Sequence, residues 1–431
     1  MASQNKLFHH TKIIVGPLLL LGSLILHSTA YATDKLKING LIDIQAAAIS
    51  NGHKSWIQGG PLGLRYSEND DIVQLAQGGF DLSYSITSAL KGDLTVLTYT
   101  GDQAEVTVSE ALVHYKPIPS SQWRQQYRLG IFHLPGALEN RGTLWSSPFS
   151  VSPSVINTWL GEEARVLGAE ARWTLPGQFR QANYDISLYT AVFGGNDTLG
   201  MMLTWRGWAQ HDRMTGIGSR YPVANLPQLG EDSLFEKQAL WYEPIVEVDN
   251  RLGYYLGGDL SLGKQFGRGR ALKLSYLYYD NQADPTAIKD GQYGWKTTFH
   301  HFGAHWRLSN KTEVLAQALT GSTLMGKGIT NSIEADFWSA YTLLSHRLGG
   351  HRTTLRWDRF KVEDLDQTPL DNNDEHGHSW TASYSFNWGK GFKTSISRVE
   401  WHSKRPAYEY ITGQGNEINT QQWQLSLRKY W

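Results

Sequence analysis

Two groups of charged residues in this chain have the types and spacing to sort ions by charge. One group lies in a polar stretch at 135–163 and just after it, and the other is a pair two positions apart further along the chain. Rings of carboxylates and guanidiniums at the narrow point of a pore discriminate between cations and anions. The candidate residues are Glu139, Arg141, Glu162, Glu163, Arg165, Arg356 and Asp358.

Arg356 and Asp358 share one face if their segment is a strand, because side chains alternate with a period of two. A simpler interpretation is that they only pair with each other inside a polar interior. The stretch 135–163 carries three acids against Arg141 and is therefore net acidic. A strong preference for anions would contradict a selective role for these acids.

Other reactive residues do not form a recognisable catalytic or metal-binding pattern. The chain lacks the G-x-S-x-G and H-E-x-x-H motifs, so we expect no enzyme, no cofactor and no metal centre. His301 and His305 would lie about 13 Å apart along a strand, too far to share one ion. His376 and His378 lie near the acids of 371–375 in the sequence. This grouping has two interpretations, a weak divalent-cation site and a polar loop that is only solvated.

Alternating apolar and polar residues predict the strands that would position these charges. Trp380, Ala382, Tyr384, Phe386 and Trp388 alternate with small polar residues, which predicts a lipid-facing and an interior face. The last segment alternates in the same way and stops at Trp431, as the closing strand of an outer-membrane barrel usually does. The segments 337–346 and 393–402 alternate poorly.

Short and long connections between these segments follow one another in strict order. Seven tight joints and eight long, polar joints predict an all-β, transmembrane antiparallel β-barrel of sixteen strands. Its turns would be periplasmic and its long loops external. The stretch 135–163 is then a candidate constriction loop, or else a surface loop whose rings pack against its neighbours. The stretch 194–251 is a longer external loop.

Composition and the N-terminal segment agree with this class of protein. Residues 1–32 combine Lys6 and Lys12, an apolar run and Ala30-Tyr31-Ala32, which predicts a signal peptide and leaves 33–431 as the barrel. The remaining chain has 38 basic and 40 acidic residues, so it has no basic field to recruit nucleic acid. The absence of cysteine suits export to an oxidising compartment.

A short stretch resembles a known porin family. Arg128-Leu129-Gly130-Ile131-Phe132-His133-Leu134-Pro135, followed by Leu138-Glu139-Asn140, resembles the G-x-F-x-x-P…E-N pattern of the phosphate-selective porin O/P family. Gly194 to Asp197, Trp205 to Gly207 and Arg356 to Asp358 are similar to Gram-negative porin-like proteins more broadly. The resemblance implies a sixteen-stranded outer-membrane channel, typically a homotrimer, with an inward third loop. The acidic 135–163 stretch departs from the arginine- and lysine-rich constriction of that family, so phosphate selectivity does not follow.

The sequence therefore predicts an outer-membrane, porin-like channel for passive diffusion of small hydrophilic solutes, with lipid and lipopolysaccharide around it. Two alternatives stay open. One is a substrate-specific channel for anions or sugars, in which Trp145, Trp159 and Trp205 form a stacking track; the alternative interpretation of the same rings is that they are packing residues. The other is a plugged barrel with a binding or enzymatic role at its external loops.

Overall fold

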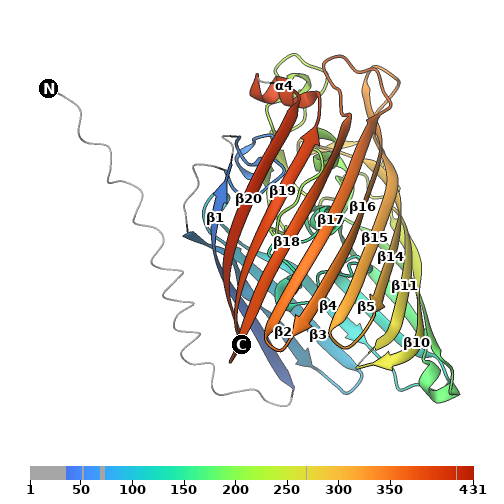
Figure 1. The fold of residues 1–431 in the computed structure, drawn as a ribbon. Helices are drawn as coiled ribbons and strands as arrows, with labels where there is room; N and C mark the ends of the chain where they lie inside the picture. The colour runs from blue at the N-terminus through green and yellow to red at the C-terminus, as the bar shows by residue number, and fades with distance from the viewer. Residues whose placement is uncertain (1–34, 51–52, 68–72, 268, 414) are drawn as a thin grey trace.

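The chain folds into one closed barrel of sixteen antiparallel strands, which confirms the predicted fold class (Figure 1). The computed structural model describes residues 35–50, 53–67, 73–267, 269–413 and 415–431, so the predicted signal peptide, 1–32, lies outside the described residues. The barrel strands are β1 (Leu36–Ile49), β2 (Val73–Ser85), β3 (Leu90–Tyr99), β4 (Glu105–Tyr115), β5 (Arg124–His133), β6 (Arg165–Leu175), β7 (Tyr184–Gly194), β10 (Gly253–Phe266), β11 (Gly269–Asp280), β14 (Lys296–Arg307), β15 (Thr312–Gly326), β16 (Ser332–Leu348), β17 (His351–Asp364), β18 (Glu375–Gly389), β19 (Phe392–Lys404) and β20 (Glu417–Tyr430).

The first and last strands close the barrel. β1 pairs with β20 from Leu41↔Tyr430 to Ile49↔Gln422. Arg428 Nε donates to Asp43 Oδ2 over 2.7 Å on the inner side of this seam, where both side chains are buried. The closing strands are therefore joined by a buried ion pair as well as by their backbone ladder.

Strand alternation separates a lipid-type outer face from an inner face. On β20, Trp423, Leu425 and Leu427 are exposed outward, while Gln424 and Ser426 are buried inward. β18 shows the same pattern, with Trp380 and Tyr384 outside. The outward side chains form an apolar band of the kind that faces hydrocarbon in outer-membrane barrels.

Connections differ at the two ends of the barrel, as predicted. One end, the turn end, carries the short joints and both ends of the described chain (Figure 1). The other end, the loop end, carries α4 (Ala407–Thr412) and two small sheets, β8 (Tyr221–Pro222) with β9 (Trp241–Tyr242) and β12 (Ile288–Lys289) with β13 (Gln292–Tyr293). None of the helices in the described part of the chain is long and apolar enough to cross a bilayer.

The inner face is less polar than the sequence pattern predicts. From β7 to β17 it carries large apolar and aromatic side chains such as Phe193, Tyr255, Phe299, Phe337 and Leu343, all of them buried. β18 to β20 instead present mainly serine, threonine and glutamine to the interior. The apolar part of the wall is covered by loop residues rather than by water, which accounts for the difference from the expected polar lumen.

A plugged lumen as the candidate functional site

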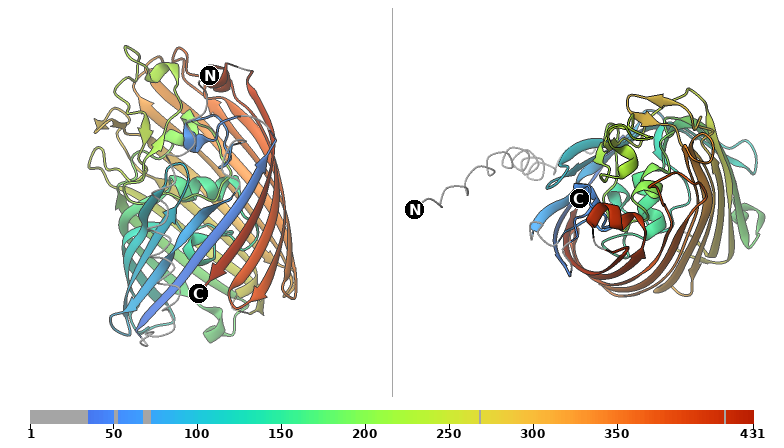
Figure 2. Two further views of the ribbon diagram at one scale, coloured as in Figure 1. Left: turned by 90° about the vertical axis from the view of Figure 1, so that its left-hand side faces the viewer. Right: turned by 90° about the horizontal axis from the view of Figure 1, so that it is seen from above.

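Three long connections enter the barrel and fill it at mid-height. They are residues 53–67 of the first connection, 134–164 of the third and 195–252 of the fourth. Figure 2 shows the teal and green segments of the third and fourth connections inside the ring of strands. We call their buried part the plug. Its apolar side chains join those of the wall in one continuous core that includes Leu64, Val155, Trp159 and Leu203.

The third connection turns inward directly after β5. Gly136 has a φ of 124° and lies against His301 of β14, where a Cβ would come within 2.8 Å of Nδ1. Only glycine accommodates both that backbone conformation and that approach. The connection then forms α2 (Val155–Glu162), whose N-cap Ser154 accepts a hydrogen bond from the Asn157 amide over 3.3 Å.

Helix α2 is buried on every side. Its Trp159 ring contacts Phe299 and Phe337 of the wall and Trp208 of the fourth connection in edge-on geometry, with centroids 5.4–5.9 Å apart. Such contacts add to the burial of a large apolar surface. The aromatic wall is therefore the surface against which the helix docks.

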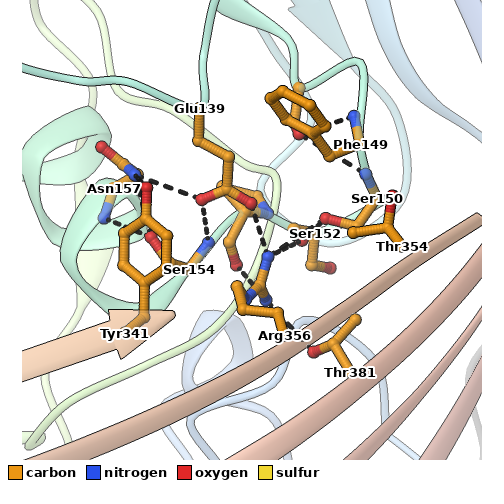
Figure 3. A network of polar contacts seen from close by, with 12 residues as sticks. Glu139, Phe149, Ser150, Ser152, Ser154, Asn157, Tyr341, Thr354, Arg356 and Thr381 are labelled. Atoms are coloured by element: carbon orange, nitrogen blue, oxygen red, sulfur yellow. Dashed lines mark hydrogen bonds and ion pairs between the residues drawn. The ribbon is translucent and has the colours of Figure 1, made fainter. Parts of the chain in front are cut away.

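Glu139, Arg356 and Asp358 form one buried network between the plug and the wall. Figure 3 shows Glu139 of the third connection facing Arg356 of β17. Arg356 Nη1 lies 2.6 Å from Glu139 Oε1, and its Nε lies 2.8 Å from Asp358 Oδ2. Arg356 also donates to the carbonyls of Ser152 and Pro153. The predicted pairing of Arg356 with Asp358 is thus real, and it is part of a larger clamp on the third connection.

The acids of this clamp also hold backbone amides. Glu139 Oε2 accepts from the Ser154 N–H over 2.8 Å, and Asp358 Oδ1 accepts from the Val155 N–H over 3.0 Å. These amides belong to the N-cap residue and the first residue of α2, where helix N–H groups have no partner within the helix. Glu139 of the third connection and Asp358 of the wall therefore cap the helix, and Arg356 neutralises both acids.

Glu162 and Glu163 are neighbours with different partners. They end α2 rather than lying extended, and both are buried. Glu162 is bound by both Nη groups of Arg206 and lies 3.6 Å from His211 Nε2. Burial alone would raise the pKa of Glu162, but Arg206 and His211 lower it to about 2.

Glu163 is held by neutral donors. Its Oε2 accepts from Trp159 Nε1 over 2.5 Å and its Oε1 from the Met202 N–H over 3.0 Å. Burial, followed by the charge of Glu162, raises the pKa of Glu163 to about 7. Burial also lowers the pKa of His211. The two adjacent carboxyls thus titrate far apart inside the plug.

Arg165 and Arg141 lie away from these acids. Arg165 is buried at the start of β6 and donates to the Gly161 carbonyl over 2.9 Å and to Thr215. Arg141 is 36 % exposed and lies 3.4 Å from Glu313 towards the turn end. The structure therefore brings Glu139, Arg356 and Asp358 together, places Glu162 and Glu163 beside Arg206, and leaves the two arginines apart.

A second group of charges lies between the plug and the turn end. These side chains face the interior, and all but the buried Glu170 and His305 are partly exposed, so they form a charged, solvent-accessible surface below the plug. The group consists of Glu170 with Arg128 and Arg172, Asp259 with Arg172 and Lys273, and Glu313 with Arg141, Arg352 and His305. Sequence alternation places most of them inward, but their pairing across strands is not visible in the sequence.

The first and fourth connections meet in another buried network that the sequence did not single out. Arg65 Nη1 lies 2.8 Å from Asp212 Oδ1, and Gln45 of β1 donates to Asp212 over 2.6 Å. Tyr66 donates to Gln45 over 2.8 Å. Of these four residues only Gln45 lies on a strand, and the other three belong to connections without periodicity.

The three candidate ring residues do not form a track. Trp159 lies in the core around α2, Trp205 packs edge-on against Trp295 in a separate core at the loop end, and Trp145 stacks on His133. Trp159 and Trp205 are fully buried. They are packing residues in this conformation.

The closed sixteen-stranded antiparallel barrel is a fold of outer-membrane β-barrel proteins. Among solved structures, the outer-membrane channel DcaP of Acinetobacter baumannii matches with a TM-score of 0.52 and 11% identity, over 92% of this chain and 97% of that chain. A loop-deletion mutant of OmpT, an outer-membrane protein of Vibrio cholerae, matches with a TM-score of 0.50 and 8% identity, over 92% and 99%. No protein-family model and no curated protein matches the chain, so the resemblance to phosphate-selective porins is not confirmed.

Proposed function

We propose that this chain is an outer-membrane channel for passive diffusion of small hydrophilic solutes, and that its own loops close it in the conformation described here. The observation that carries the proposal is the construction of the plug. It is fixed to the wall by side-chain contacts such as Glu139–Arg356, and no disulfide is available because the chain has no cysteine. A plug held in this way can move without breaking the barrel ladder.

Charge selection would then reside in two places. Glu139 and Glu162 are neutralised by Arg356 and Arg206 while the plug is closed, and Glu163 is buried among neutral donors. The partly exposed pairs near the turn end meet solutes in every state of the plug. We therefore propose weak ion selectivity, set by Glu139, Glu162 and Glu163 only when their partners separate.

The location follows from the outer surface. We propose that the chain is exported through the periplasm after loss of 1–32 and that its apolar band contacts outer-membrane lipid and lipopolysaccharide. Trp423, Leu425 and Leu427 are each about half exposed on this band. Assembly as a homotrimer is part of the proposal, and we assign no enzymatic activity, cofactor or nucleic-acid partner to the chain.

A second candidate is a plugged barrel whose loop end binds other molecules. The separate apolar core at that end favours it, because Trp56, Met202, Tyr221, Phe235 and Trp295 build a folded cap there instead of loose loops. A cap of this kind has the order that a binding surface requires.

Planar-bilayer recordings separate the two candidates. The full chain and a variant with 140–160 replaced by a short Gly-Ser linker are refolded and inserted under the same conditions. A channel predicts rare, small openings for the full chain and sustained ohmic steps for the variant. Silence of both proteins at all voltages would overturn the channel and favour the binding barrel, provided that both are folded.

A further inference from the structure

Six basic side chains lie together on the outer surface of the barrel, near the loop end of β17, β18 and β19. Figure 1 shows these three strands side by side. The residues occupy two neighbouring cross-strand rows, Arg359–His378–His402 and Lys361–His376–Lys404. All six side chains point outward and are half-buried or exposed. We call them the basic array.

The acids around the array neutralise only part of its charge. They lie at its edges, with Glu363 2.6 Å from Lys361, Glu417 3.6 Å from His402, and Glu400 2.5 Å from Arg398, which is outside the array. Within the described part of the chain, Arg359 and Lys404 form no ion pair. Like charges on directly opposed strand positions destabilise a sheet. An anion lying over the array would therefore stabilise the folded barrel.

Aromatic side chains indicate the depth of the array in the membrane. Trp357 and Trp380 are the next outward residues towards the turn end on β17 and β18, and they are 37 % and 45 % exposed. Their ring centroids are 6.3 Å apart. Outward rings of this kind mark the boundary between hydrocarbon and lipid headgroups in outer-membrane barrels. The array therefore lies at the level of the headgroups.

The positive charge is concentrated on one side of the barrel. The row of Arg359 continues across β16, β15 and β14 as Ala340, Ala318 and Phe302. On the other side this row reaches Asn419 of β20, opposite His402. Along this row the charge is thus confined to three strands, which is the pattern of a local binding site and not of an evenly solvated rim.

A hollow of about 280 Å³ opens on the outer surface beside the array. Residues that line it include His378, Trp380, Glu400, His402 and Asn419. The imidazole rings of His378 and His402 are adjacent, with centroids 5.0 Å apart. Imidazole and amide groups hydrogen-bond to sugar hydroxyls and phosphates, while an indole offers an apolar face. This combination suits a phosphorylated sugar better than a simple ion.

We propose that the basic array binds the phosphorylated sugar headgroup of lipopolysaccharide. The proposal rests on the outer-membrane location proposed above, in which the loop end faces the outside of the cell. Arginine and lysine form charge-assisted hydrogen bonds to phosphate, and basic clusters beside membrane-spanning segments recognise anionic headgroups. The Cα atoms of Arg359 and Lys404 are roughly 12 Å apart, two strands across and two residues along. They can therefore reach different phosphates of one headgroup.

The array also accounts for His376 and His378, which the sequence places near several acids. Both histidines point outward from β18, while Glu375 beside them is buried on the inner side. They therefore share a face with Arg359 and Lys361 of the neighbouring strand, and not with that acid. This placement favours an anionic ligand over a cation.

Bisphosphorylated lipid A, the glucosamine disaccharide anchor of lipopolysaccharide, is the probe. The full chain is refolded in nonionic detergent and titrated with lipid A, and native mass spectrometry measures the bound fraction. The double variant Arg359→Gln/Lys404→Gln should bind about tenfold more weakly or worse, because each basic residue at a membrane surface contributes to anion binding. Lys311→Gln/Arg347→Gln removes the same charge from exposed positions at the turn end and should bind as the wild type does.

Two further lipids separate phosphate recognition from attachment to any lipid. Dephosphorylated lipid A and phosphatidylglycerol should bind the wild type no better than they bind the Arg359→Gln/Lys404→Gln variant. Equal affinity of the wild type for all three lipids would overturn the proposal, as would equal lipid A binding by the wild type and the folded double variant. Heat-modifiable migration on gels shows that each variant is folded. None of these results depends on conductance, so the channel proposal is tested separately.

Discussion

The guanidinium of Arg356 lies 2.6 Å from the carboxylate of Glu139, and the two residues are 217 positions apart in the chain. Arg356 belongs to the wall and Glu139 to the third connection, and both side chains are fully buried. Asp358 lies on the other side of the same guanidinium. One arginine therefore neutralises two acids and fixes the plug to β17.

Removing Arg356 should loosen the plug. In Arg356→Ala, Glu139 and Asp358 would be buried without their cation, which costs about 3–5 kcal/mol for a broken buried pair. We expect urea unfolding of the refolded barrel to shift by this amount and channel openings to become more frequent. Arg359→Ala, at an exposed position of the same strand, should cost less than about 1 kcal/mol. Equal effects of the two substitutions would contradict the clamp.

Helix α2 should detach when its anchor ring is removed. Trp159→Ala deletes a buried indole that contacts Phe299, Phe337 and Trp208, and such truncations cost about 3–5 kcal/mol. We expect faster amide hydrogen exchange across 134–164 with little change in the wall strands. Trp306→Ala removes an outward, exposed ring and serves as the control. Unchanged exchange in Trp159→Ala would show that the helix is held by other contacts.

The barrel could be predicted from sequence because its signals are local. The alternation on β18 and β20, and the length of each connection between strands, can be recognised from residues that are close together in the sequence. The plug depends on contacts such as Glu139–Arg356, which no local pattern encodes. The sequence did, however, contain one signal of the plug. The segment 337–346 alternates poorly because Phe337, Tyr341 and Leu343 face inward and pack on the plug while Leu344 faces lipid.

The same reason applies to 393–402. Val399 and Trp401 point into the core on the inner face of β19, while Arg398, Glu400 and His402 face outward, so the usual polarity of the two faces is reversed there. Large apolar side chains on the inner face of a barrel strand therefore indicate an interior that is filled by protein. These strands do not show which loops fill the interior. An alternation pattern identifies the inward-facing residues of the wall, but not the loop residues that pack against them.

The plug should become less stable as the pH rises from about 5 to 8. Glu163 has a pKa of about 7 in the folded protein and an ordinary value near 4.3 when unfolded. The folded state therefore holds a proton that the unfolded chain has lost, and this contribution to stability disappears as the pH rises through 7. We expect a loss of roughly 2–4 kcal/mol over this interval.

Glu163→Gln isolates this effect. The amide mimics the protonated acid, so the slope of stability against pH between 5 and 8 should be smaller than in the wild type. Glu162, with a pKa of about 2, acts with the opposite sign and only below about pH 4.5, outside this window. Urea unfolding followed by tryptophan fluorescence measures the slope, with exposed Glu236→Gln as control. An identical slope in Glu163→Gln would refute the assignment.

The free-energy cost of placing a charge on the outward apolar band should depend on how deep in the bilayer the substituted position lies. Leu425 is half exposed near the middle of β20, and Leu348 is exposed at the turn end of β16. In phospholipid vesicles Leu425→Arg should cost about 2–4 kcal/mol and Leu348→Arg about 0–1 kcal/mol, because arginine is expensive only near the bilayer midplane. Urea titration of folding into vesicles gives both values. Equal costs at the two positions would mean that the band does not lie in hydrocarbon, since in water both side chains would be equally solvated.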